Sequence, residues 1–419
     1  MKILLSAYAC RPNSGSEEGN GWNWSVSLAQ MNHQVWVLTC FESRPFIEKV
    51  TNVQEIPNLH FVYVDTPNNL VQRIMNHTRL SWQYSYFNWQ YEALRVAKQL
   101  DRKFDFDIVH HVTWGSITAG SRLWLLPKPF VFGPVGGGQT APPTLKKYFL
   151  NDWRNEALRS LLFAKLSGLN WFFRQTVSHA DLVLATNQDT YDLAMESGAN
   201  RTKLFFDPGL PEDYFPTQLP ARNVAQNFKL LWVGSLIPRK GLRLTLESLS
   251  KVKSAIPFKL TIVGSGSQTE YLSEWIREFG LEQRVDLCGR LPWLKVKELY
   301  LSSDVFFFTT LRDSCPTQFL EAMSHGLPII TLNIHGAIKF IPDSAGIKVP
   351  VTKANQTVEA LANAIEYVYK NPQERLRMGQ VGYEFAKTQT WSSKASKMTK
   401  YYNELLKKAE RKSMINQSR

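Results

Sequence analysis

Short apolar runs that end in glycine and are followed by helical segments recur along this chain, and this alternation limits its fold more than any other feature. In the C-terminal half, Lys229–Val233 ends at Gly234, Phe258–Val263 ends at Gly264 and Val285–Cys288 ends at Gly289. Strands separated by helices indicate parallel sheets of the doubly wound kind. Because 419 residues exceed the usual size of one domain, we predict two α/β domains.

The wording of the chain changes after residue 206. Proline, glycine and polar residues cluster from Asp207 through Asn227, which is typical of a linker. We therefore predict an N-terminal domain at 1–206, a linker at 207–227 and a second domain at 228–388. Residues 389–419 are predicted to form a basic amphipathic helix.

The formal net charge of +13 is concentrated in the second half of the chain. Much of it follows residue 393, on a segment that is either a solvated basic helix or a surface for anionic lipid or nucleic acid. No nucleic-acid-binding motif accompanies this charge, so a nucleic-acid partner is not expected. The basic residues of this segment are Lys394, Lys397, Lys400, Lys407, Lys408, Arg411, Lys412 and Arg419.

Cysteine usage and hydropathy bear on the compartment. Cys10, Cys40, Cys288 and Cys315 are scattered, without a C-x-x-C pair, which argues against a disulfide framework or a zinc site. The apolar start is too short for a signal peptide, and no run is long enough to span a membrane. We expect a cytoplasmic protein, with attachment to the inner face of the membrane left open.

Residues 304–331 form a strand, a loop, a helix and a second strand. Pro316 suits the first turn of the helix, while Gly326 and Pro328 end it. Asp313 lies just before the helix and Glu321 within it, so both carboxylates can face one ligand at the helix N-terminus. The alternative is a solvated loop aspartate and a surface glutamate.

A glycine-rich loop follows the first strand, Lys2–Tyr8, and contains Gly15, Ser16 and Glu17. The loop lacks the G-x-G-x-x-G pattern and carries acids where a pyrophosphate would lie, which disfavours a dehydrogenase. An ordinary surface turn is the alternative interpretation.

His110 and His111 stand at the carboxyl end of another predicted strand, where parallel sheets bind ligands. Either can be a core residue or line a reaction centre. Asp105 and Asp107 precede that strand instead of following it, so we interpret them as its start and expect no metal site.

Two apolar or aromatic segments allow more than one interpretation. The aromatic residues between Trp82 and Tyr91 are expected to lie mainly in the core. Leucines from Leu158 to Leu169, with Phe173, fall on one helical stripe that indicates either core packing or a basic, aromatic interfacial helix at a membrane.

The spacing of an acid, seven residues and then Glu321-Ala-Met-x-x-Gly-x-Pro resembles the donor-binding motif of retaining glycosyltransferases of family 4, in which the first acid is usually Glu and here is Asp313. Arg239 and Lys240 after Gly234, and the Gly136–Gly138 cluster, are similar to other segments of that family. The resemblance implies the GT-B fold: two Rossmann-like domains facing across a cleft, with the C-terminal helix crossing back to the N-terminal domain.

The resemblance also implies roles for individual residues. Arg239 and Lys240 would contact the donor diphosphate, Glu321 the ribose and Asp313 the donor sugar. His110 or His111 would line the sugar face, and Lys240 and Asp313 would act with them in catalysis. The remaining donor-binding candidates are Gly15, Ser16, Glu17, Gly264, Cys315, Pro316, Thr317 and Gln318.

The implied function is retaining, metal-independent transfer of a hexose from a UDP- or GDP-linked sugar to an acceptor hydroxyl, in polysaccharide, glycolipid or glycoconjugate synthesis. The nucleotide sugar is a co-substrate, and no cofactor is expected. The acceptor would be a sugar, a lipid-linked sugar or a small molecule, with an anionic membrane surface as a further partner left open. Alternatives are a GT-B-like sugar-nucleotide epimerase, a non-catalytic sugar-nucleotide binder and a nucleic-acid binder.

Overall fold

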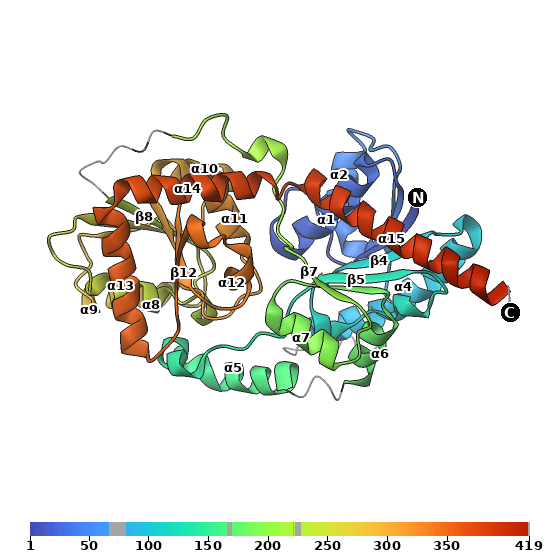
Figure 1. The fold of residues 1–419 in the computed structure, drawn as a ribbon, viewed down its shortest axis with the longest axis horizontal. Coiled ribbons are helices and arrows are strands. Elements are labelled where there is room, and N and C mark those ends of the chain that lie inside the picture. The colour runs from blue at the N-terminus through green and yellow to red at the C-terminus, as the bar shows by residue number, and fades with distance from the viewer. Residues whose placement is uncertain (67–80, 166–169, 221, 223–227, 418–419) are drawn as a thin grey trace. The chain divides into compact units, whose positions relative to one another are not determined.

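The computed structural model describes residues 1–66, 81–165, 170–220, 222 and 228–417, and these form two compact α/β units (Figure 1). The first unit comprises Met1–Gly138, Lys165–Asp207 and Trp391–Arg419, and the second comprises Gln139–Ala164 and Pro208–Thr390. Two parallel-sheet α/β units were predicted from the alternation of strands and helices, and this fold class is confirmed.

The first unit is built on a parallel sheet of seven strands in the order β3-β2-β1-β4-β5-β6-β7. Strand β4 is buried at every position, as expected for a central strand covered by helices on both faces. The strands are β1 (Lys2–Ala7), β2 (Gln34–Cys40), β3 (Leu59–Val64), β4 (Ile108–Thr113), β5 (Phe130–Val135), β6 (Leu182–Ala185) and β7 (Thr202–Leu204). The helices are α1 (Ser16–Gln30), α2 (Arg44–Thr51), α4 (Ser81–Phe104), α6 (Trp171–His179), α7 (Gln188–Glu196) and α15 (Trp391–Gln417), with short 3-10 turns η1 (Phe41–Ser43), η2 (Ile117–Ala119) and η3 (Arg122–Leu125).

The second unit has a parallel sheet of six strands in the order β10-β9-β8-β11-β12-β13. Its strands are β8 (Phe228–Val233), β9 (Phe258–Val263), β10 (Val285–Leu287), β11 (Val305–Phe307), β12 (Ile329–Leu332) and β13 (Gly346–Val349). Its helices are α5 (Trp153–Arg159), α8 (Leu242–Ser250), α9 (Leu272–Glu278), α10 (Trp293–Ser302), α11 (Thr317–Ser324), α12 (Gly336–Phe340), α13 (Ala354–Lys370) and α14 (Pro372–Lys387). Shorter turns are η4 (Pro143–Asp152), the π-helix η5 (Ser160–Lys165), η7 (Glu212–Tyr214), η8 (Pro238–Lys240), η9 (Thr269–Tyr271) and η10 (Asp343–Ala345).

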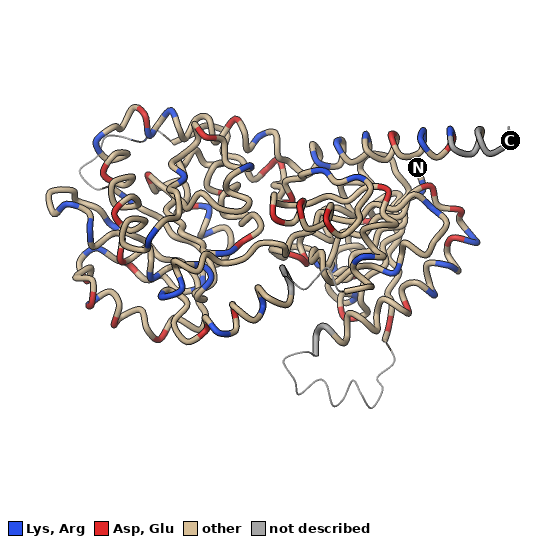
Figure 2. The backbone as a smooth tube through the Cα atoms, turned by 60° about the horizontal axis from the view of Figure 1, so that its bottom comes forward, with Lys and Arg blue, Asp and Glu red and all other residues tan. Residues whose placement is uncertain are grey.

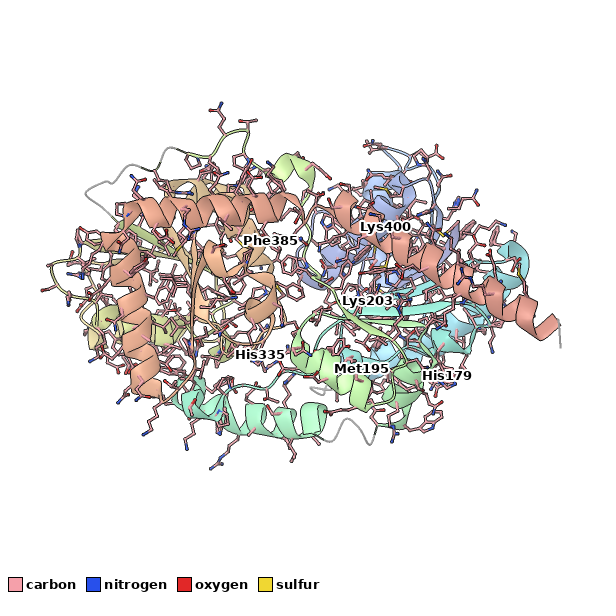
Figure 3. The ribbon with its side chains drawn as sticks, in the orientation of Figure 1. His179, Met195, Lys203, His335, Phe385 and Lys400 are labelled. Carbon is pink, nitrogen blue, oxygen red and sulfur yellow. The ribbon has the colours of Figure 1, made fainter. Side chains whose placement is uncertain are left out.

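Helix α15 packs against the first unit, although it follows the second unit in the sequence. Trp391, Met398, Tyr402 and Leu405 are buried in the same apolar cluster as Trp24 of α1. Lys203 of β7, labelled in Figure 3, lies with its Nζ atom 4.0 Å from the centre of the Tyr401 ring. The apolar face of α15 is therefore part of the core of the first unit.

The segment 139–164 lies in the second unit, whereas the sequence suggested a first domain running continuously to residue 206. Lys147 Nζ lies 2.8 Å from Glu247 Oε1 on α8, and the Phe149 side chain is buried. Long-range contacts of this kind have no signal in local composition, which changes only near residue 207.

Helix α15 carries many of the basic side chains that the charge count placed near the C-terminus (Figure 2). Across the described ranges, no helix combines the length and apolarity needed to cross a membrane. Nor do the residues with described positions include a group of three or more His, Cys, Asp or Glu side chains arranged to hold a metal ion.

Candidate functional site

The strand ends of the second sheet come close together at their carboxyl edge. A Cβ atom on Gly264 would lie 1.8 Å from the Gly234 carbonyl oxygen, and its φ of +142° disfavours other residues. The amide of Gly264 also donates to the Gly289 carbonyl at 2.8 Å. This packing accounts for glycine at position 264 without the donor contact that the sequence suggested.

The turn η8 is joined directly to the loop between β11 and α11. The Leu311 amide donates to the Arg239 carbonyl at 2.8 Å, and the Thr310 hydroxyl donates to the same oxygen at 3.2 Å. The Thr309 hydroxyl donates to the Gly241 carbonyl at 2.8 Å. These bonds hold the two cations of η8 beside the loop that carries Asp313.

Asp313 forms ion pairs with both of those cations. Its Oδ2 atom contacts the Lys240 ammonium and lies 3.2 Å from Arg239 Nη1. Burial alone would raise the pKa of Asp313, but Lys240, Arg239 and Arg312 together hold that pKa below its ordinary value. The sequence assigned Asp313 and the two cations to different parts of one ligand, and the structure shows that they also contact one another.

Three further charged residues complete this cluster, and none of them was predicted from the sequence. Arg312 Nε lies 2.6 Å from Glu156 Oε1, and Arg159 Nη1 lies 3.9 Å from the same oxygen. Burial, with the nearby Arg312 charge, lowers the pKa of Arg159 to about 10. Arg312 could have been noticed as the neighbour of Asp313. Glu156 and Arg159 had no local signal, because they belong to the segment that joins the second unit.

The resulting charge cluster has more cations than carboxylates. Arg159, Arg239, Lys240 and Arg312 lie around Asp313 and Glu156. Lys240 is only 7% exposed and Glu156 is equally buried, so these charges are poorly screened by water. The cluster therefore favours an additional anion at the carboxyl edge of the sheet.

Helix α11 begins beside this cluster, as the sequence predicted. Pro316 is its N-cap residue, and Pro316 has no amide hydrogen, so it cannot donate to an anion as the range Cys315–Gln318 implied. Thr317 and Gln318 lie in the first turn of the helix and are partly exposed. The following loop is close: a Cβ on Gly336 would lie 1.8 Å from the Ser314 carbonyl oxygen.

Glu321 is half-buried on α11 and is held by side chains from α10. The Tyr300 hydroxyl donates to its Oε2 atom at 2.9 Å, and the Trp293 indole N–H donates to Oε1 at 3.4 Å. Burial raises the pKa of Glu321, although both donors oppose that effect. Tyr214 of η7 stacks on Trp293 with ring centres 4.5 Å apart, so the segment after the first unit contacts this site.

In the first unit, Glu17 connects two loops at the carboxyl edge of the sheet. Its Oε2 atom accepts a hydrogen bond from the Gly115 amide at 3.0 Å. Burial raises the pKa of Glu17 to about 7, and the Asp207 charge contributes to this shift. Gly15 and Ser16 precede it at the start of α1, and a Cβ on Gly15 would contact nothing within 4 Å.

The structure places both histidines in the core, which corrects the expectation that one of them lines the site surface. His110 Nδ1 lies 2.6 Å from the Tyr402 hydroxyl and His110 Nε2 lies 2.6 Å from the Gly133 carbonyl. His111 contacts the Ser6 hydroxyl at 3.1 Å and the Trp114 carbonyl at 3.2 Å. Burial lowers the pKa of His110 to about 3 and that of His111 to about 4, so both imidazoles are neutral.

The two segments with open interpretations lie partly in the core and partly at the surface. Of the aromatic stretch, Tyr86 and Trp89 are buried, but Phe87 and Tyr91 are exposed. Of the leucine stripe, Phe173 is buried, while Leu158, Leu161 and Leu162 are exposed instead of forming a core. Leu166 and Leu169 lie outside the described residues, as does the side chain of Trp82.

Two parallel-sheet units with this arrangement of strands place the protein in the GT-B class of folds. Sucrose-phosphate synthase from Thermosynechococcus elongatus is similar to this chain with a TM-score of 0.70 and 18% identity, over 96% of this chain and 98% of that one. Anabaena HepE, crystallised with UDP, is similar with a TM-score of 0.63 and 17% identity, over 96% of this chain and all of that one (100%).

Sequence comparisons identify the family. The family model described as Glycosyltransferase Family 4 matches residues 22–205, and the model described as Glycosyl transferases group 1 matches residues 220–385. The chain belongs to the family 4-like glycosyltransferases.

Individual relatives are distant. One, from Arabidopsis thaliana, belongs to phosphatidylinositol N-acetylglucosaminyltransferase and is 22% identical over 219 residues, which are 52% of this chain and 47% of the relative. D-inositol 3-phosphate glycosyltransferase from Corynebacterium glutamicum is 23% identical over 183 residues, 42% of this chain and 43% of the relative. The alignments thus span less than half the length of these curated relatives.

Proposed function

We propose that this protein transfers a hexose from a nucleotide diphosphate sugar to an acceptor hydroxyl with retention of configuration. The observation that carries the proposal is the charge cluster of the second unit, in which four cations lie around two carboxylates at the start of α11. A diphosphate would satisfy this excess positive charge. The structure of HepE with UDP supports a nucleotide donor for this fold.

The cations would serve both binding and catalysis. On donor binding, Lys240 and Arg239 would exchange part of their contact with Asp313 for contacts with phosphate oxygens. They would then stabilise the negative charge that develops on the leaving diphosphate. Asp313, freed in part from these cations, would accept hydrogen bonds from hydroxyls of the donor sugar. We propose that this chemistry proceeds without a metal ion, since the cationic side chains can offset the phosphate charge.

Glu321 would bind the ribose. Its two carboxylate oxygens already accept hydrogen bonds from Tyr300 and Trp293, which orient the group. Ribose hydroxyls would replace the longer bond from Trp293 or add to it. In the first unit, Glu17 would assist on the acceptor side, because a carboxyl whose pKa lies near 7 can exchange a proton at neutral pH.

A thermal-shift screen of UDP-, GDP-, ADP- and dTDP-sugars tests the donor. We expect one nucleotide to stabilise the protein clearly, and expect Lys240→Ala and Glu321→Ala each to lower kcat/KM by about 100-fold or more because they remove diphosphate and ribose contacts. Asp313→Glu, which restores the acid usual in the family, should retain transfer. Lys251→Ala and Glu359→Ala change exposed residues of the same types and should have no effect.

The proposal would be contradicted if Lys240→Ala and Glu321→Ala both kept nucleotide-sugar binding and transfer. Conversion of the nucleotide sugar to an epimer without an acceptor would contradict it as well.

A further inference from the structure

A single exposed stripe runs along helix α4 in the first unit. Phe87, Tyr91, Arg95, Lys98 and Arg102 are all exposed, and their spacing of three or four residues places them on one side of the helix. The stripe is aromatic in its first part and basic in its second part. The opposite side of α4 is buried, with Tyr86, Trp89, Ala93 and Ala97 in the apolar core.

Neighbouring elements extend the aromatic part of this stripe. Phe172 of α6 contacts Phe87 with ring centres 6.1 Å apart. The Arg122 guanidinium of η3 lies 3.6 Å from the centre of the Tyr91 ring and 5.0 Å from that of Phe172. Trp171, the first residue of α6, is 65% exposed, which is far more than a core tryptophan shows. Large apolar side chains from two helices thus gather at the surface of one unit, with Arg122 of η3 among them.

The charge of this surface is positive. The two acidic residues of α4 are engaged within the unit: Glu92 Oε2 lies 2.8 Å from Arg95 Nε, and Asp101 Oδ1 lies 3.5 Å from Lys128 Nζ. Lys98, Arg102 and Arg174 are exposed on α4 and α6. An aqueous protein surface gains nothing from exposed Trp, Phe and Tyr beside cations, whereas the interface of an anionic bilayer accommodates both.

We propose that this surface, formed by the stripe of α4 with Arg122 and Trp171, docks the first unit on an anionic lipid bilayer. Helix α4 would lie in the plane of the interface. The rings of Phe87, Tyr91 and Trp171 would enter the boundary between headgroups and acyl chains, and Arg95, Lys98 and Arg102 would contact lipid phosphates. The proposal concerns binding to the bilayer itself and does not depend on the nature of the donor or acceptor.

Vesicle flotation with the full-length protein tests the proposal. We expect binding to phosphatidylcholine vesicles that contain phosphatidylglycerol, weaker binding to pure phosphatidylcholine, and a decrease as salt is raised from about 50 to about 500 mM. The double variant Phe87→Ala/Tyr91→Ala should bind at least about tenfold more weakly because it removes the inserted rings. Arg95→Gln/Lys98→Gln should lose the preference for anionic vesicles.

Tyr367→Ala is the matched control, because Tyr367 is 46% exposed on α13 of the second unit, close to the 49% of Tyr91. It should bind vesicles like the unchanged protein. Retention of the thermal unfolding temperature by all variants shows that any loss is not caused by unfolding. Equal binding by the double variant and the control would overturn the proposal, as would a dimer in sedimentation that the double variant dissociates.

Discussion

Glu17 and Glu321 are both half-buried glutamates with raised pKa values, but their partners differ. Glu321 accepts hydrogen bonds from two side chains of α10, whereas Glu17 accepts from a backbone donor, the Gly115 amide. A carboxylate with few donors gains less in its ionised form, so burial dominates its titration. Glu17 is therefore poised to change its charge near pH 7.

Glu17→Gln is expected to change how stability depends on pH. Because the folded-state pKa of about 7 lies above the unfolded value of 4.5, ionisation is disfavoured in the folded protein. The stabilising contribution of protonated Glu17 is complete below about pH 4.5 and is lost as pH rises through about 7. Glutamine keeps the acceptor for Gly115 but cannot ionise.

The unfolding temperature of Glu17→Gln should thus exceed that of the unchanged protein at pH 8 and match it near pH 4.5, as measured by circular dichroism. Glu18→Gln, which changes the neighbouring and partly exposed carboxylate, is the control. Equal pH profiles for the Glu17 variant and the unchanged protein would show that Glu17 titrates normally.

At the scale of elements, close backbone contacts decide where glycine is needed. The start of α1 contains three glycines, and the sequence did not distinguish their roles. A Cβ on Gly19 would lie 2.0 Å from the Ser14 carbonyl oxygen and one on Gly21 would lie 2.1 Å from the Ala9 carbonyl oxygen, whereas one on Gly15 would meet nothing within 4 Å. The loop therefore depends on Gly19 and Gly21 to fold against the helix.

Gly19→Ala should lower the free energy of unfolding by at least about 2 kcal/mol, because backbone atoms must move to accept the methyl group. Gly15→Ala is the matched control and should be neutral or slightly stabilising, since it reduces the freedom of the unfolded chain. Urea denaturation measures both. Similar losses for the two variants would mean that the loop is packed differently.

At the scale of the whole molecule, residues far apart in the chain complete the core of the first unit. His110 of β4 and Tyr402 of α15 form a buried pair although they are 292 positions apart in the sequence. The Gly133 carbonyl can only accept, so His110 Nε2 carries the proton and Nδ1 accepts from the Tyr402 hydroxyl. This bond joins the last helix to the centre of the sheet.

Tyr402→Phe should lower the free energy of unfolding by about 1–3 kcal/mol, because it leaves His110 Nδ1 buried without a donor. Tyr401→Phe removes the hydroxyl of the adjacent, partly exposed tyrosine and should cost little. Calorimetry of the full chain compares the two. Equal stability of both variants would mean that the hydroxyl of Tyr402 is not needed in the core.

Local sequence patterns were enough to establish the class of fold and the composition of the donor-side motif. Strands that alternate with helices are visible in short windows, and Asp313, Glu321, Arg239 and Lys240 stand at loop and helix positions that such windows reveal. The predicted helix between the strands of residues 304–331 is confirmed as α11.

Which of these side chains meet, and which are buried, became clear from the packing of the folded chain alone. Asp313 pairs with cations 73 and 74 positions away, Glu156 reaches Arg312 from a segment assigned to the other domain, and His110 is enclosed by α15. These contacts depend on how separate elements pack, and packing depends on shape and burial over long sequence distances. A strand end therefore predicted where a ligand could bind, but it could not show that both histidines there belong to the core.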